Sequence, residues 1–281
     1  EKIDEETNSD INISTKWTNL NRYDNDSIAP FIILSYDLEC TSQDGSFPQA
    51  ERLKDKIIQI GSTFSRYGVK GEKICFYKNL ITLGGCDKIE GVDVESYKTE
   101  KEVLMAWNRL LNRMNPDIIT GYNIFGFDEK YLLGRSKVLG IEDKFSSIGR
   151  FYFENCEFVT KKLSSSALGD NLLHYYNDIG RVKIDLMKVV QRDFKLSSYK
   201  LDNVASHFIK NKIDSVNYNE ETNILKIYSS SFIDLQNESY ISILIDDGLA
   251  PSKLNELKFP VIRKYSVLKE FRSILGDKLD D

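Results

Sequence analysis

The chain of 281 residues has few cysteines and histidines and no excess of positive charge. Its four cysteines lie far apart without a Cys-x-x-Cys pair, which predicts reduced thiols in a cytosolic or nuclear setting and no zinc site. No apolar run approaches the roughly 18 residues of a membrane-spanning helix, and the acidic start is neither a signal peptide nor a basic transit segment. The net charge of −5 argues against broad duplex binding through a basic surface, but it leaves room for a small site.

The chain does contain enough apolar sequence for a sizeable core. Hydrophobic residues make up 41% of it and charged residues 29%, the balance of a soluble globular protein. Thr99 and Glu102 form a predicted capping box at the start of a helix over 99–115, whose large apolar residues share one face. Before this helix, strands are predicted near 31–37, 56–64, 73–79 and 91–95. The strand near 91–95 is shorter than the first three, and this three-strand start, followed by helix, strand and helix, is a ribonuclease H-like order.

The first candidate site closes a strand. The apolar run from Phe31 to Leu34 predicts a strand buried on both faces, and Asp37 and Glu39 follow it. Side chains alternate along a strand, so the two carboxylates face the same way, about 7 Å apart, and can share one hard cation. The alternative is that the two acids lie on a solvated strand face. The Asp-x-Glu pattern is a weak signal by itself, because it occurs three times in the chain. Only this copy follows a continuous apolar run, where burial would make two charges costly without a cation.

The second candidate site is a strand-turn-helix junction. A helix end and Pro116 precede a short apolar strand, Gly121 allows a tight turn, and Asp128 stands at the start of the next helix. The N-terminus of a helix favours negative charge, so helix capping explains Asp128 as well as metal binding does. The turn by itself is likewise an alternative explanation for Asn123.

Further segments join these two sites in the order of a known family. They are Lys56-Ile-Ile-Gln-Ile-Gly61, 83–94, 99–115, 117–124, Gly180-Arg-Val-Lys-Ile-Asp-Leu-Met187 and Ser198-Tyr-Lys-Leu-Asp-Asn-Val-Ala205. Over residues 29–210 the chain resembles the 3′→5′ exonuclease domain of B-family DNA polymerases, closest to the delta type and to large eukaryotic DNA viruses. The resemblance implies an α/β, ribonuclease H-like exonuclease domain with a mixed central sheet.

The resemblance also implies roles for five residues. Asp37, Glu39 and Asp128 match catalytic carboxylates that hold two Mg²⁺ (or Mn²⁺) ions. Asp37 would bridge both ions, Glu39 would serve the ion that generates the hydroxide nucleophile, and Asp128 would serve the other. Asn123 and Phe127 match residues that contact the terminal nucleotides of a frayed DNA strand, where an aromatic face can stack on any base. Core packing is the alternative for Phe127.

The third motif of this family, a Tyr followed four residues later by Asp, is not found. No Tyr has Asp at +4, and neither His174 nor His207 has Asp at +5. In the family this Asp completes the metal site and the Tyr orients the attacking water. The polymerase motifs are absent as well, so we expect a fragment that stops short of the third motif. The alternative is a catalytically inactive exonuclease fold that binds DNA or partner subunits.

We expect three parts in the chain. Residues 1–28 are a polar tail or the end of a preceding domain, 29–212 are the exonuclease core, and 213–281 are a β-rich insertion and a truncated approach to the third motif. Within the insertion, short strands are predicted at 224–228, 231–235 and 240–245.

The partners implied by the resemblance are a single-stranded DNA 3′ end or primer–template DNA, the rest of the polymerase chain and a sliding clamp, with no membrane. The implied location is the nucleus or a viral replication site in the cytoplasm. Residues 181–213 carry eight Lys or Arg against three Asp, which is typical of a path for a DNA strand or of a solvated helical face.

Overall fold

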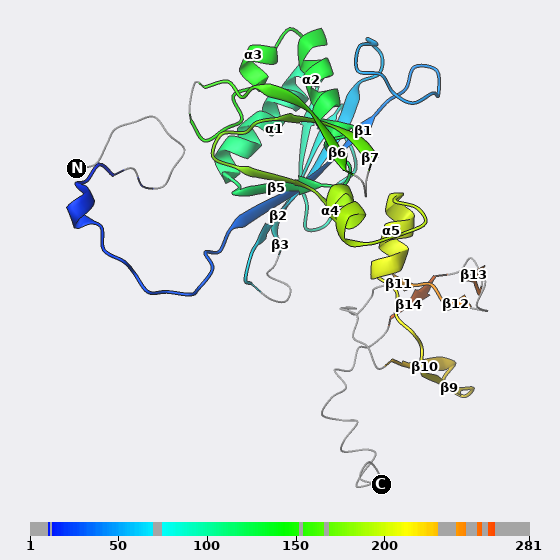
Figure 1. The fold of residues 1–281 in the computed structure, drawn as a ribbon. Helices are drawn as coiled ribbons and strands as arrows, with labels where there is room; N and C mark the ends of the chain where they lie inside the picture. The colour runs from blue at the N-terminus through cyan, green and yellow to red at the C-terminus, as the bar shows by residue number, and fades with distance from the viewer. Residues whose placement is uncertain are drawn as a thin grey trace. The chain divides into compact units, whose positions relative to one another are not determined.

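The computed structural model describes residues 11, 13–69, 75–151, 154–165, 169–229, 240–245, 252–254 and 258–261. The chain forms two compact units, Glu1–Leu201 and Asp202–Asp281. The first unit carries all five predicted site residues, and its elements are labelled in Figure 1. The predicted domain boundaries at residues 28 and 212 stay predictions. Among the described residues, no helix is long and apolar enough to cross a membrane.

A six-stranded mixed sheet forms the centre of the first unit. Its strands are β1 (Ile32–Cys40), β2 (Ile57–Arg66), β3 (Cys75–Leu83), β4 (Asp93–Tyr97), β5 (Ile118–Gly121) and β8 (Val182–Asp185), in the order β4-β3-β2-β1-β5-β8. β1 pairs antiparallel with β2 and parallel with β5, and β5 pairs parallel with β8. The carboxyl ends of β1, β5 and β8 therefore meet at one edge of the sheet. The expected mixed α/β fold of the ribonuclease H-like type is confirmed.

Three helices complete the core of this unit. They are α1 (Glu100–Met114), α2 (Asp128–Val138) and α3 (Glu142–Phe145), and Figure 1 shows them gathered together against the sheet. The capping box of Thr99 and Glu102 is present, which confirms the predicted start of α1. The apolar face of α1 packs on β2 and β3, and it buries Trp107 and Leu111 completely or nearly so. This burial fixes the sheet and helices as one body by removing apolar area from water.

A hairpin follows the helices along the chain. It consists of β6 (Phe158–Ser165) and β7 (Gly169–Tyr176), paired antiparallel in a sheet of their own. The backbone N–H of His174 donates to the carbonyl of Phe125 at 3.0 Å, which ties β7 to the loop before α2. After β8 the chain enters α4 (Leu186–Asp193), where the Asp185 side chain caps the helix by accepting from the Met187 N–H. The short helix η1 (Trp17–Asn19) precedes the sheet.

In the second unit, the described residues include several short strands. The chain passes into it through α5 (Leu201–Phe208). β9 (Ser215–Asn219) and β10 (Ile224–Tyr228) form a hairpin, which confirms the strand predicted at 224–228. The strand predicted at 240–245 is two short pieces, β11 (Tyr240–Ile241) and β12 (Leu244–Ile245), which pair with β14 (Phe259–Pro260) and β13 (Ser252–Lys253) respectively. The strand predicted at 231–235 lies outside the described residues.

Candidate active site

Asp37 and Glu39 lie on the open face of β1. Both residues are exposed, while their neighbours Tyr36 and Leu38 are buried, so the two acids face the same way as predicted. The expectation of a strand buried on both faces is wrong. β1 buries one face against the core and leaves the acidic face to solvent, and this exposure explains how the chain tolerates two charges there.

The surface beside Asp37 is open toward the neighbouring strand. Asp37 lies opposite Gly61 of β2, and a Cβ added to Gly61 would meet no atom within 4 Å. On the side of β5, Gly121 approaches β1 closely, since an added Cβ would lie 2.7 Å from the carbonyl oxygen of Tyr36. Gly61 thus leaves space next to the Asp37 carboxylate, and Gly121 allows β5 to lie close to β1.

The loop between β5 and α2 is held by a buried carboxylate that sequence reasoning did not single out. Asp185 accepts hydrogen bonds from the backbone N–H groups of Asn123 at 2.9 Å and Phe125 at 3.0 Å. Asn123 itself has a left-handed backbone with φ of 63°, as its turn role predicts. The parallel pairing of β5 and β8 brings these residues together across 62 positions of sequence. The only sequence signal was that Asp185 lies in a family-like segment.

Asp128 is the first residue of α2, as predicted, and it is buried. Asp128 is only 3% exposed, and its Oδ1 has no hydrogen-bond partner among the described residues. Removal from water raises the pKa of Asp128 to about 8, and the negative charge of Asp37 is the second cause. Partial desolvation also raises the pKa of Asp37, although that residue as a whole is exposed. The charge of Asp37 therefore acts on the buried carboxyl of Asp128.

This donor set fits a hard cation in part. In the described portion of the chain, no three His, Cys, Asp or Glu side chains are gathered closely enough to hold a metal ion by themselves. The orphaned Oδ1 of Asp128 is nevertheless a ligand atom without a partner, and carboxylate oxygens suit Mg²⁺ and Mn²⁺. A cation beside Asp37 and Asp128 would offset their repulsion and keep Asp128 ionised at neutral pH.

Phe127 belongs to an aromatic cluster at the start of α2. Its ring is half-buried and lies 5.2 Å from Phe47 in an edge contact and 5.0 Å from Tyr131. The core packing weighed for Phe127 is therefore real for part of the ring. Phe47 was missed, and it is 73% exposed. An aromatic residue in the polar loop between the first two strands was the signal that could have indicated it.

The loop that carries Phe47 is ordered by buried polar groups. Asp55 is fully buried and accepts from the backbone N–H groups of Gln43 and Gln49. Arg135 of α2 donates from Nη1 to the carbonyl oxygens of Ala50 and Arg52, both at 2.8 Å. These bonds fix the loop on α2, so Phe47 is presented beside Phe127 by a rigid support.

A cleft of about 460 Å³ adjoins the turn at Asn123. One wall is the segment after α4, where the Tyr122 hydroxyl donates to the carbonyl of Tyr199 at 2.5 Å. The cleft is lined by Tyr122, Asn123, Met187, Tyr199, Lys200 and Leu201. Asn123 thus has open space in front of it, as contact with a ligand requires.

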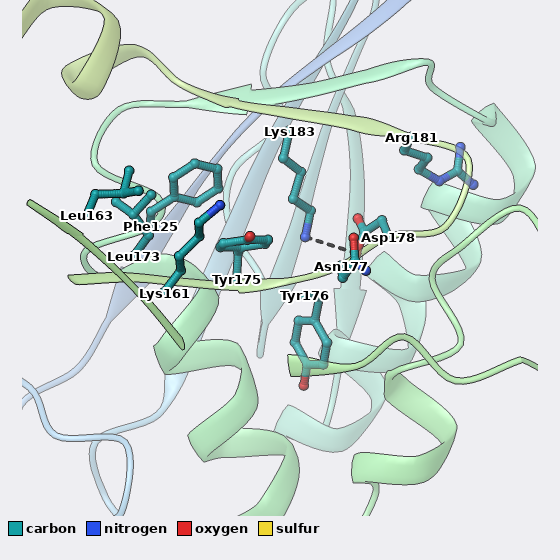
Figure 2. Close-up of a pocket in the computed structure, with 10 residues that line it drawn as sticks. All are labelled: Phe125, Lys161, Leu163, Leu173, Tyr175, Tyr176, Asn177, Asp178, Arg181 and Lys183. Carbon is teal, nitrogen blue, oxygen red and sulfur yellow. Dashed lines mark ion pairs between the residues drawn. The ribbon is translucent and has the colours of Figure 1, made fainter. Parts of the chain in front are cut away.

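A second hollow of about 230 Å³ lies between the hairpin, β8 and Phe125 (Figure 2). Within it Lys183 forms an ion pair with Asp178 at 3.0 Å. Arg181 is 8% exposed and donates to the carbonyl of Pro116. Lys183 and Arg181 of the basic stretch at 181–213 thus have buried partners within the protein. For these two residues, neither a path for a DNA strand nor a solvated helical face applies.

The strand order and the acidic groups at the carboxyl edge of the sheet define the class of the protein as a ribonuclease H-like nuclease fold. A family model described as "DNA polymerase family B, exonuclease domain" matches residues 1–204. The chain therefore belongs to the family of B-family DNA polymerase exonuclease domains.

The relatives found in comparisons of sequence agree with this membership. A DNA polymerase of Acanthamoeba polyphaga mimivirus is 34% identical over 91% of this chain and 20% of its own length. A DNA polymerase of Pyramimonas orientalis virus is 52% identical over 58% of this chain and 13% of its own. The DNA polymerase delta catalytic subunit of Dictyostelium discoideum is 39% identical over 69% of this chain and 17% of its own. The chain spans a fifth or less of these relatives.

Proposed function

We propose that this chain is the proofreading 3′→5′ exonuclease region of a DNA-directed DNA polymerase, which hydrolyses the last phosphodiester of a frayed DNA 3′ end. Family membership supports the reaction class. The observation that carries the proposal is the buried carboxylate of Asp128, which has an oxygen without a partner and lies within electrostatic reach of Asp37. A buried acid in this state is costly to the fold unless a cation or a proton compensates it.

Three carboxylates would hold the metal in this proposal. Asp37 and Glu39 of β1 and Asp128 of α2 would be the residues that hold the ions. When bound, two Mg²⁺ or Mn²⁺ ions supply a hydroxide-generating Lewis acid and offset charge on the leaving oxygen. Glu39 has the same open face as Asp37, so both acids are accessible to ions and to a strand end.

Aromatic and polar groups beside the carboxylates would hold the DNA. Asn123 borders the cleft after β5, and Phe127 packs against the exposed ring of Phe47. An exposed ring can stack on a base of any identity, which suits an enzyme that must accept every mismatched end. Arg181 and Lys183 are buried, so basic residues that bind the DNA phosphates would have to be other side chains.

The proposal also includes the partners that the resemblance implies. They are a single-stranded 3′ end or primer–template DNA, the rest of a polymerase chain and a sliding clamp. The corresponding location is the nucleus or a viral replication site in the cytoplasm.

Digestion of an end-labelled single strand tests the proposal. In the complete protein that contains these residues, Asp37→Ala or Asp128→Ala should lower the rate by about 1000-fold, because several kcal/mol of charge stabilisation is lost. Asp87→Ala, an exposed acid between β3 and β4, is the matched control and should retain full activity. Wild-type rates in both site variants would refute the assignment. A wild type that binds the strand without cutting it would indicate the inactive fold instead.

A further inference from the structure

A lysine is buried between two carboxylates behind the proposed active site. The Nζ of Lys183 lies 2.8 Å from Oε2 of Glu129 and 3.0 Å from Oδ1 of Asp178. The three side chains are only 7%, 1% and 0% exposed, respectively. Figure 2 shows the lysine extending from β8 toward Asp178. Replacement of a buried ion pair by apolar residues is often neutral or stabilising, whereas removal of one partner leaves an uncompensated buried charge and is strongly destabilising.

Glu129 is the member of this group that reaches the strand of the active site. Its Oε1 accepts from the Tyr36 hydroxyl at 2.8 Å, and its Oε2 accepts from the backbone N–H of Tyr176 at 3.0 Å. Lys183 donates to both oxygens, at 2.9 and 2.8 Å. One carboxylate therefore links β1, β7, β8 and α2, and each of its two oxygens accepts from two donors.

The link joins the immediate neighbours of two proposed metal ligands. Tyr36 precedes Asp37 on β1, and Glu129 follows Asp128 on α2. Tyr36 is buried and Asp37 is exposed, so the hydrogen bond lies on the face of β1 opposite to the Asp37 side chain. The bond therefore joins the two elements that carry these ligands, β1 and α2.

We propose that Tyr36 and Glu129, with Lys183 as the cation that orients Glu129, are positioning residues that set the spacing between Asp37 and Asp128. The inference rests on the proposed exonuclease function. A displacement of about 1 Å in a reacting group can cost 10²-fold in rate, and loss of an outer contact typically costs 10- to 100-fold in metal affinity.

Tyr36→Phe is the direct test, because it removes only the hydroxyl. The ring keeps its packing against Trp107, whose centroid lies 5.0 Å away. Tyr77→Phe is the matched control, since Tyr77 also donates to a carboxylate of a neighbouring strand, Asp93, at 2.7 Å. Mn²⁺ binding to the complete protein is measured by the loss of the free-ion paramagnetic resonance signal. We expect about tenfold weaker binding in Tyr36→Phe and wild-type binding in Tyr77→Phe.

Digestion kinetics give a second readout that a purely structural role would not move. The Mn²⁺ concentration for half-maximal rate should rise about tenfold in Tyr36→Phe, with an unchanged KM for DNA. Glu129→Gln keeps an oxygen for Tyr36 but loses the charge that Lys183 holds, so it should bind Mn²⁺ more weakly as well. Both changes weaken the same connection from Lys183 through Glu129 to Tyr36, so the double variant should bind Mn²⁺ about as weakly as whichever single variant binds it less well. Additive losses would overturn the inference.

Asp37→Ala separates this inference from the function on which it rests. If Asp37→Ala binds Mn²⁺ like the wild type, the proposed metal site is wrong, and the positioning role is wrong with it. If Asp37→Ala loses Mn²⁺ while Tyr36→Phe behaves as Tyr77→Phe does, only the positioning role is wrong. Loss of binding in Asp37→Ala together with tenfold weakening in Tyr36→Phe supports both.

Discussion

Replacement of Asp128 by asparagine should stabilise the metal-free protein at neutral pH. The carboxyl is buried, and desolvation followed by the charge of Asp37 raises its pKa to about 8. An unfolded aspartate titrates near about 3.9, so between about pH 4 and pH 8 the folded protein keeps a proton that the unfolded chain has released. Stability from this group is therefore full below the unfolded pKa and is lost as the pH rises toward 8.

The size of this effect follows from the pKa shift. At pH 7, which lies below the folded pKa of about 8, the loss of stability accumulates from the unfolded pKa of 3.8 up to pH 7. At about 1.4 kcal/mol per pH unit, this interval corresponds to about 4 kcal/mol. Asparagine has no titrating group, so Asp128→Asn should lack this slope. The metal-free variant should then exceed the wild type by up to about 4 kcal/mol at pH 7 and match it near pH 4.

Urea unfolding in the presence of a chelator, across about pH 4 to 8, measures both slopes. Asp87→Asn, at an exposed position, is the control and should follow the wild type. Added Mg²⁺ should then stabilise the wild type but not Asp128→Asn, because a ligand that binds only the folded state shifts the equilibrium toward it. If the free energy of unfolding depends on pH in the same way for the wild type and for Asp128→Asn, the reasoning that Asp128 is a buried acid compensated by a cation is refuted.

Two further predictions concern the support of the site and its DNA contact. Arg135→Met leaves Glu100, its buried partner at 2.5 Å, without a cation, so calorimetry should show a loss of about 3–5 kcal/mol. Lys137→Met, at an exposed ion pair with Glu142, should lose less than about 1 kcal/mol, and equal losses would contradict the argument. Phe47→Ala should raise the KM for single-stranded DNA by about 5- to 150-fold, the worth of one stacked base. Phe76→Ala, on β3 away from the loop, should leave KM unchanged, and an equal rise there would exclude a special role for Phe47.

Much of the local structure was predictable because short-range contacts decide it. Thr99 and Glu102 are three residues apart, and their reciprocal hydrogen bonds start α1 where the sequence predicts. Asp128 begins α2, and Asn123 occupies the turn, for equally local reasons. The alternation along β1 placed Asp37 and Glu39 on one face.

The burial of each acid was not predictable, because it depends on which face of an element meets the core. The apolar run before Asp37 suggested burial on both faces, yet the strand is covered on one face only. Asp128 is the buried acid, because the start of α2 lies against the end of β1. Phe47 was not foreseen either, since its support comes from Arg135 of a helix more than 80 positions away.

The sequence by itself determined the fold class, the family and the residues that the proposed chemistry needs. Periodicity, caps and turns act over a few residues, and the family segments follow one another in a fixed order. Only the tertiary structure decided which carboxylate is desolvated and which groups hold it. Tyr36 and Glu129 stand 93 positions apart, and Lys183 stands a further 54 beyond Glu129. Contacts over such separations arise from strand pairing and helix packing, which no local pattern encodes.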